Sequence, residues 1–158
     1  GVYNLRAKEE NGVYVPTLKL SASYEKTPNP GIKQVYRFFD KNGQALADLI
    51  TLNDERIVEG ENHLFYHPFS TQDMFVMRKN IYAEIKPLLK KQMENGKRIN
   101  PSPSLKEIQQ RSIEMLSHFD KSYKRQINPH IYKVSLSTKL KNLKGNLIMQ
   151  AKMAEDKI

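Results

Sequence analysis

The side chains that could carry chemistry in this 158-residue sequence are its histidines and carboxylates, because there is no cysteine to act as a nucleophile or metal ligand. His63 and His67 are four residues apart, a spacing that can place two metal ligands on one face of a helix, but Pro68 and the alternating residues between the histidines indicate a strand. His130 follows an Asn-Pro pair and is typical of a loop residue that bonds to the backbone. We therefore predict no metal ligand among these histidines or at His118.

The carboxylates of Asp48, Asp54 and Glu55 could hold Mg²⁺, which prefers oxygen ligands. They stand in a hairpin and a loop, however, where solvated acidic residues are usual. The seven glycines are scattered among turns and form no phosphate-binding loop. No serine or threonine has a base and an orienting group near it in sequence. We predict no catalytic, cofactor-binding or metal-binding residue in this chain.

The net charge of +9 favours polyanionic or phosphorylated partners. The basic residues are nevertheless spread along the chain among acidic ones, as on solvated surfaces. An alternative interpretation is a basic module that binds nucleic acid, supported by aromatic residues beside Arg37 and by the Tyr123-Lys124-Arg125 run. No zinc knuckle, RNP-like motif or GxxG loop supports it, so we expect nucleic acid not to be a partner.

The elements of the first half are predicted to be antiparallel β-hairpins. Asn11-Gly12 and Asn42-Gly43 tolerate positive φ and suit tight turns between runs of alternating apolar residues. Pro28 and Pro30 break the chain between two hairpins, since proline donates no backbone hydrogen bond. The predicted strands are 2–8, 13–20, 33–39, 45–52, 63–66 and 74–77.

The second half is predicted to be mainly helical with one short strand. A short helix is expected to start near Pro87 and to end at Asn95-Gly96, and a second to start at Ser104 with a Ser-x-x-Glu capping box. A strand over 131–136 and a helix over 137–152 follow. The predicted fold class is α+β, with antiparallel hairpins over 1–78 and helices over 79–158, packed as a single domain. No apolar run approaches the roughly 18 residues of a membrane span, and no secretory signal is expected.

Short motifs at both ends of the chain resemble nicotinate phosphoribosyltransferases, in the region that follows the catalytic barrel. They read GVYNL at 1–5, LKLS at 18–21 and PGIKQVYR at 30–37, then PSL at 103–105, NPHxY at 128–132 and VxLSxxL at 134–140. Residues 53–100 match only loosely. Asn4 stands where the family usually has lysine, which leaves that position without a family role. The chain also starts without methionine, inside a strand pattern, and we expect it to be the C-terminal piece of a longer protein.

The resemblance implies a parent enzyme that joins nicotinate to the ribose of phosphoribosyl pyrophosphate in NAD salvage, using Mg²⁺ and ATP. In the family the reacting groups come from the barrel, which would precede Gly1. The expected partners are the barrel and the N-terminal domain of the same enzyme, with a second copy forming a homodimer in the cytoplasm. The fragment alone is expected to be inactive. A third interpretation, a purely structural domain that dimerises the parent, overlaps this one.

Four residues in the first half are the candidates for a functional role, because they would lie closest in sequence to the barrel. They are Lys19, Ser21, Lys33 and Arg37. They could raise the positive potential of a phosphate-binding cleft or pack across a subunit interface. The simpler interpretation is that they are solvent-facing or loop residues with structural partners.

Overall fold

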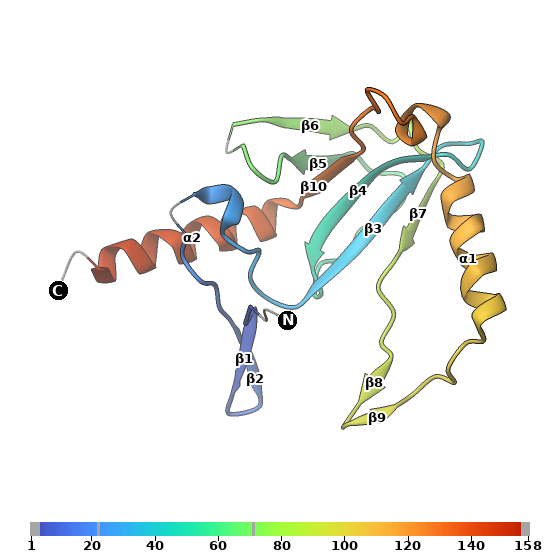
Figure 1. The fold of residues 1–158 in the computed structure, drawn as a ribbon. Coiled ribbons are helices and arrows are strands. Elements are labelled where there is room, and N and C mark those ends of the chain that lie inside the picture. Colours follow the sequence, from blue (N-terminus) through green and yellow to red (C-terminus); the bar gives the residue numbers. More distant parts are fainter. Residues whose placement is uncertain (1–3, 22, 71, 156–158) are drawn as a thin grey trace.

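A six-stranded sheet forms the centre of the computed structural model, which describes residues 4–21, 23–70 and 72–155 (Figure 1). The strand order is β6-β5-β10-β4-β3-β7, and all neighbours are antiparallel except β10 and β4, which run parallel. The mixed sheet and the two helices confirm the predicted α+β class. The strands are β3 (Lys33–Phe39), β4 (Ala45–Leu52), β5 (His63–Tyr66), β6 (Met74–Met77), β7 (Glu84–Pro87) and β10 (Lys133–Leu136).

The β3–β4 hairpin is the longest strand pair in the sheet, and both strands have the predicted bounds. Its turn follows from local chemistry. Gly43 adopts a φ of 74°, which costs glycine little, and the Asp40 carboxylate accepts hydrogen bonds from the backbone N–H groups of Asn42 and Gln44. The turn sets the register that places Phe38 opposite Ala47. Strands β5 and β6 also have the predicted bounds.

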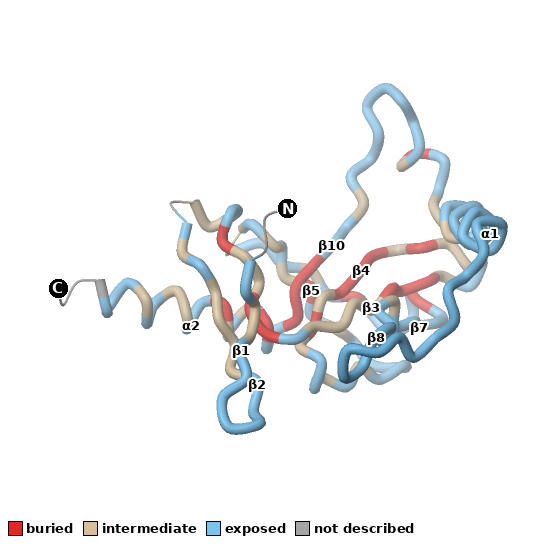
Figure 2. The backbone as a smooth tube through the Cα atoms, turned by 60° about the horizontal axis from the view of Figure 1, so that its bottom comes forward, coloured by how far each residue is buried: buried red, intermediate tan, exposed pale blue. Residues whose placement is uncertain are grey.

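The core lies around Phe38, which is fully buried. Its ring makes edge-to-face contacts with Phe65 and Tyr82, with centroids 5.0 Å apart in each case. Ala47 and Leu49 of β4 complete the same buried face. Buried residues follow β3, β4 and β10 in Figure 2, so the centre of the sheet holds the core of the domain.

Strand β10 comes from the second half of the sequence but lies in the middle of the sheet, between β5 and β4. It is followed directly by helix α2 (Thr138–Glu155), which packs on β4 and β5 through the buried Leu140. Ser137 joins the two elements, since its hydroxyl accepts from the Leu140 N–H and donates to Glu55. The strand and helix predicted over 131–152 are confirmed, with slightly different bounds.

The helix predicted near Pro87 is wrong. Residues 84–87 form β7, which pairs with β3, and Asn95-Gly96 is the turn of a small hairpin, β8 (Met93–Glu94) with β9 (Lys97–Arg98). Both turn residues have positive φ, 48° for Asn95 and 74° for Gly96, as a two-residue hairpin turn requires. Pairing of β7 with β3 satisfies backbone groups that a helix containing Pro87 would have left partly unpaired.

The first hairpin is shorter than predicted and shifted along the chain. Strand β1 (Ala7–Glu10) pairs with β2 (Val13–Pro16) around the Asn11-Gly12 turn. The second strand was predicted to continue to residue 20 but ends at Pro16, which has no N–H for a ladder. Residues 1–3 of the first predicted strand, which include part of the GVYNL motif, lie outside the described residues.

Helix α1 (Leu105–Ser117) begins with the predicted capping box: the Glu107 N–H donates to the Ser104 hydroxyl, and the Glu107 carboxylate accepts from the Ser104 N–H. The helix has no buried residue, and it is coloured almost entirely as exposed in Figure 2, with Met115 of intermediate exposure. Its apolar stripe remains open, with Leu105 72 % exposed and Leu116 55 % exposed. Within the described ranges, no helix has the length and apolarity needed to cross a membrane.

Candidate functional site

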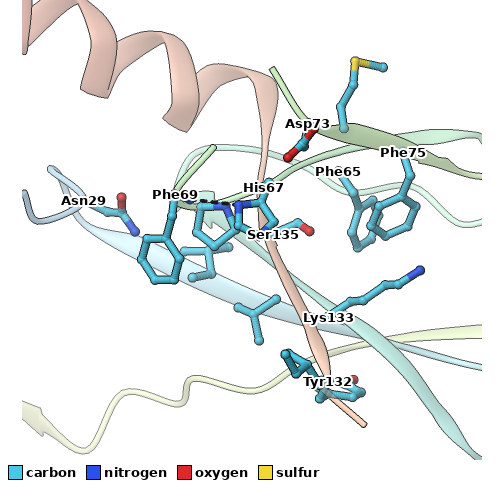
Figure 3. A pocket seen from close by; sticks show the side chains of 14 residues that line it. Asn29, Phe65, His67, Phe69, Asp73, Phe75, Tyr132, Lys133 and Ser135 are labelled. Atoms are coloured by element: carbon cyan, nitrogen blue, oxygen red, sulfur yellow. Dashed lines mark hydrogen bonds between the residues drawn. The ribbon is translucent and has the colours of Figure 1, made fainter. Parts of the chain in front are cut away.

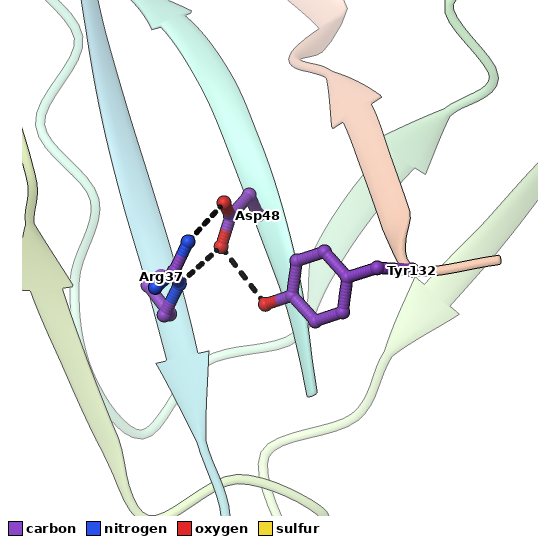
Figure 4. Close-up of polar contacts among 3 residues, drawn as sticks. All are labelled: Arg37, Asp48 and Tyr132. Atoms are coloured by element: carbon purple, nitrogen blue, oxygen red, sulfur yellow. Dashed lines mark hydrogen bonds and ion pairs between the residues drawn. The ribbon is translucent and has the colours of Figure 1, made fainter. Parts of the chain in front are cut away.

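Arg37 on β3 and Asp48 on β4 form the most buried ion pair among the described residues (Figure 4). They stand opposite each other in the β3–β4 register, and each side chain is 10 % exposed. The guanidinium donates from Nε to Oδ1 and from Nη2 to Oδ2, both at 2.8 Å. The Tyr132 hydroxyl donates to Asp48 Oδ1 at 2.9 Å. Two forked bonds and a third donor give the carboxylate three hydrogen bonds in a fixed geometry.

Aromatic rings enclose this pair. The Arg37 guanidinium carbon lies 4.7 Å from the centroid of the Phe119 ring and 5.7 Å from that of Tyr132. The Phe119 and Tyr132 rings meet edge to face at 4.9 Å, and Tyr123 packs on Tyr132 at 5.4 Å. Phe119 follows α1 and Tyr132 precedes β10, so the network attaches residues 118–132 to the sheet.

The electrostatics keep the Arg37 guanidinium charged and the Tyr132 hydroxyl protonated. The hydrogen bonds that Arg37 donates to Asp48 raise the pKa of Arg37, so the guanidinium stays charged. Burial, followed by the negative charge of Asp48, raises the pKa of the Tyr132 hydroxyl strongly, so it stays a hydrogen-bond donor. A general base needs a pKa near the working pH and a proton to accept. A phenol held protonated beside a charged guanidinium does not meet this need, and the arrangement is suited to holding structure.

An apolar groove of about 580 Å³ lies next to the network and shares Tyr132 with it (Figure 3). Phe65, Phe75 and Val134 form part of its wall, and Lys133 spans it with Nζ 4.8 Å from the Phe75 centroid. His67 lies at its edge, where Nδ1 accepts hydrogen bonds from the backbone N–H groups of residues 69 and 70. The groove presents mainly apolar side chains and few free polar groups. An apolar surface of this kind is typical of one that another segment or protein covers.

The structure separates the four residues singled out from the sequence. Arg37 is in the buried pair, and the Lys33 ammonium donates to the backbone carbonyls of Asn29 at 3.0 Å, Pro30 at 3.4 Å and Gly31. Lys19 and Ser21 are exposed and lie outside any strand or helix. Lys33 and Arg37 therefore have structural partners, and the four residues do not converge on one site.

The histidines each have a structural neighbour. His118 Nδ1 donates to the Gly43 carbonyl at 2.8 Å, His63 Nε2 donates to the Val58 carbonyl at 2.9 Å, and the His130 ring packs on Tyr123. Within residues 4–21, 23–70 and 72–155, no three histidine or carboxylate side chains come together in a way that could hold a metal ion.

The aromatic and basic residues that favoured nucleic-acid binding are also used in packing. Arg37 is buried against Asp48, and Tyr123 faces Phe119, Tyr132 and His130. Bases stack on exposed rings beside basic side chains, and Tyr123 is only half-exposed. The structure thus provides no stacking platform at these positions.

Sequence reasoning missed Asp48 and Tyr132 as partners of Arg37. Asp48 could have been paired with Arg37 from the hairpin register, since opposite charges face each other across the β3–β4 ladder. Tyr132 could not, because its position depends on β10 entering the sheet beside β4. Sequence reasoning also missed the buried Lys144 and the partly buried Arg6, which no local pattern distinguishes from surface cations.

Comparison with known proteins gives a consistent result. The family model described as the nicotinate phosphoribosyltransferase C-terminal domain matches residues 32–144. The nicotinate phosphoribosyltransferase of Bacillus subtilis is 36 % identical over 139 residues, which cover 86 % of this chain and 27 % of the relative. That of Caenorhabditis elegans is 34 % identical over 151 residues, covering 94 % of this chain and 26 % of the relative.

Among solved structures, the crystal structure of human nicotinic acid phosphoribosyltransferase matches with a TM-score of 0.66 at 28 % sequence identity. The match covers 75 % of this chain and 23 % of the human chain. The chain therefore spans about a quarter of the length of the relatives that it matches.

Proposed function

This chain belongs to the nicotinate phosphoribosyltransferase family as a C-terminal domain, and from that premise we propose that it supports the catalytic part of such an enzyme without performing the transfer itself. The observation that carries the proposal is the exposed apolar stripe on α1. The buried polar network around Arg37, by contrast, is suited to holding the fold together and not to catalysis. The chain acts as one domain over residues 1–158. The parent enzyme transfers a phosphoribosyl group to nicotinate in the cytoplasm and contributes to NAD salvage.

The apolar surface on one side of the domain supports a docking role. Leu105, Ile108 and Leu116 lie on one face of α1, since they are three and eight residues apart, and all three are exposed. The β8–β9 hairpin precedes α1 in the chain and carries the exposed Met93, with Ile99 directly after it. Exposed apolar side chains grouped in this way are typical of a surface that another part of a protein covers.

ATP and Mg²⁺ belong to the part of the enzyme that precedes this domain. Mg²⁺ needs several oxygen ligands in octahedral geometry, usually including substrate phosphates. Among the described residues no three histidine or carboxylate side chains are grouped together, and this supports placing Mg²⁺ in the preceding part. The enzyme works as a homodimer, and the same apolar surface contributes to its assembly.

The experiment produces this chain and the preceding part of the same enzyme as two separate polypeptides. Formation of nicotinate mononucleotide is measured with nicotinate, phosphoribosyl pyrophosphate, ATP and Mg²⁺. This chain alone should form none, and the two polypeptides together should co-purify and form product. Product from this chain alone would overturn the proposal.

A matched pair of variants tests the role of α1 directly. Ile108→Gln with Leu116→Gln places two amides on the apolar stripe, whereas Lys106→Gln with Glu114→Gln changes the opposite face of the same helix. Each buried side chain of this size contributes about 1.5–3 kcal/mol to association. The stripe variant should therefore bind the preceding part at least about tenfold more weakly. Equal binding by both variants would show that α1 is not the docking surface.

A further inference from the structure

A second polar cluster lies where the β1–β2 hairpin, the loop before β3 and helix α2 meet. The Arg6 carbonyl accepts hydrogen bonds from the N–H groups of Thr17 and Gly31, each at 2.8 Å. A side chain on Gly31 would lie 3.7 Å from Leu143 of α2, so the loop lies directly against this helix. Lys144 is the next residue of α2, and these contacts bring three elements distant in sequence into one corner.

This corner holds three cations. Arg6, Lys33 and Lys144 take part in none of the ion pairs found among the described residues. Lys144 is 2 % exposed, and its Nζ lies 4.1 Å from the centroid of the Tyr24 ring. Burial, and then repulsion by Arg6, lower the pKa of both Lys33 and Lys144. Buried cations of like sign without a counter-charge are costly.

The same corner contains buried polar atoms that lack a partner. Arg6 Nη1, Thr17 Oγ1 and Asn29 Oδ1 are buried and have no hydrogen-bond partner among the described residues. Most buried polar atoms in proteins have at least one partner, so Arg6 Nη1 and Thr17 Oγ1 at this corner require an explanation, whereas Asn29 lines the apolar groove. The guanidinium nitrogen and the hydroxyl can both donate to a negatively charged oxygen. Excess positive charge and unused donors together describe a site for an anion.

We propose that Arg6, Thr17 and Lys144 bind a single oxyanion at this corner. Arg6 Nη1 and the Thr17 hydroxyl donate to its oxygens, and the Lys144 ammonium supplies a third donor and a charge. Lys33 contributes charge only, because its ammonium already donates to three carbonyls. Two sources share this chemistry: a carboxylate side chain from the preceding part of the enzyme, and the phosphate group of a small molecule. The site does not depend on the catalytic role of the parent.

The experiment titrates this chain with inorganic phosphate at constant pH, with chloride at matched ionic strength as the reference. Thermal unfolding and the backbone amide NMR signals of Thr17 and Gly31 are followed. Phosphate should raise the unfolding temperature above that in chloride and should shift both amide signals. Lys144→Met should weaken phosphate binding by about tenfold or more, the effect of losing one charge-assisted bond. Lys139→Met, at an exposed position on the same helix, should bind as the unmodified chain does.

Without phosphate, Lys144→Met should unfold at the same or a higher temperature, since it replaces an uncompensated buried charge with an apolar group. If Lys144→Met does not fold, Arg6→Met removes a donor on a different element and tests the same site. The shifts of the Thr17 and Gly31 amide signals on adding phosphate are measured on the unmodified chain and so do not depend on any variant. No response of the chain to phosphate beyond chloride would overturn the proposal, as would an equal response of Lys144→Met.

The full-length enzyme separates the two sources. If a carboxylate of the preceding part fills the site, phosphate should no longer act there, and Lys144→Met should lower the unfolding temperature. If the natural ligand is a free phosphate compound, phosphate should stabilise the full-length enzyme as it does this chain. The readouts are stability and binding, so they do not depend on whether the chain supports catalysis.

Discussion

Replacing Arg37 with methionine should lower the free energy of unfolding by about 3–5 kcal/mol, the cost of breaking a buried ion pair on one side. Methionine keeps most of the aliphatic stem but removes both forked bonds to Asp48. The carboxylate, 10 % exposed, would then keep only the Tyr132 hydroxyl as a donor. A domain of this size is typically stable by about 5–15 kcal/mol, so the loss is a large share of the total.

Removing the whole network should cost less than removing Arg37 alone. The triple variant Arg37→Met, Asp48→Leu and Tyr132→Phe leaves no charge and no unpaired hydroxyl in the buried layer. Replacing all partners of a buried polar group by apolar ones of similar shape is often close to neutral. The three single substitutions should therefore be strongly non-additive, with a sum that exceeds the effect of the triple variant.

Urea denaturation followed by far-ultraviolet circular dichroism measures these differences. With a slope of about 1–3 kcal/mol per molar urea, Arg37→Met should shift the midpoint down by about 2 M. Lys86→Met is the matched control, because Lys86 pairs with Glu84 on an exposed strand surface and should change stability by less than about 1 kcal/mol. Additive single substitutions, or a cost for Arg37→Met as small as that of the control, would refute the interpretation of a desolvated pair.

Three further predictions concern other parts of the domain. Ser104→Ala removes the side-chain cap of α1, a helix without buried residues, and should speed amide exchange over residues 105–108; unchanged exchange would contradict a role for the cap. Burial, and then repulsion by Arg6, lower the pKa of Lys144 from 10.5, so the folded state binds this proton less tightly than the unfolded state. The stability of the unmodified chain relative to Lys144→Met should therefore rise as the pH increases toward 10.5. A stability difference between the two proteins that stays flat with pH would be the contrary result. Phe38→Ala should cost about 3–5 kcal/mol in urea denaturation, whereas Phe69→Ala, 54 % exposed, should cost far less; similar costs would show that the core does not centre on Phe38.

Four strands of the central sheet were predictable from the sequence because their signals are local. The alternation over 33–39 and 45–52, with Asn42-Gly43 between them, contains both the strand faces and the turn. The capping box at Ser104 and Glu107 is likewise complete within four residues. The family resemblance rested on short motifs of the same local kind, and the comparisons confirm it.

Asn95-Gly96 shows where local signals stop being sufficient. The pair suits both the end of a helix and a two-residue hairpin turn, since both need positive φ. The choice depends on the edge of β3, which pairs with β7 and takes residues 84–87 into the sheet. That edge exists only after the distant β3–β4 hairpin has formed.

Tertiary structure decided which distant residues complete the polar clusters. Arg37 meets Tyr132 because β10 enters the sheet parallel to β4, and the loop at Gly31, which bonds to Arg6, meets α2 because that helix packs beside the first hairpin. In the sequence these are surface-type residues, since burial of a charge depends on which elements cover it and not on its neighbours in the chain. The sequence by itself determined the strands and turns whose signals are local, such as β3, β4 and the turn between them, and the family. The packing of distant elements determined which of the charges were removed from water.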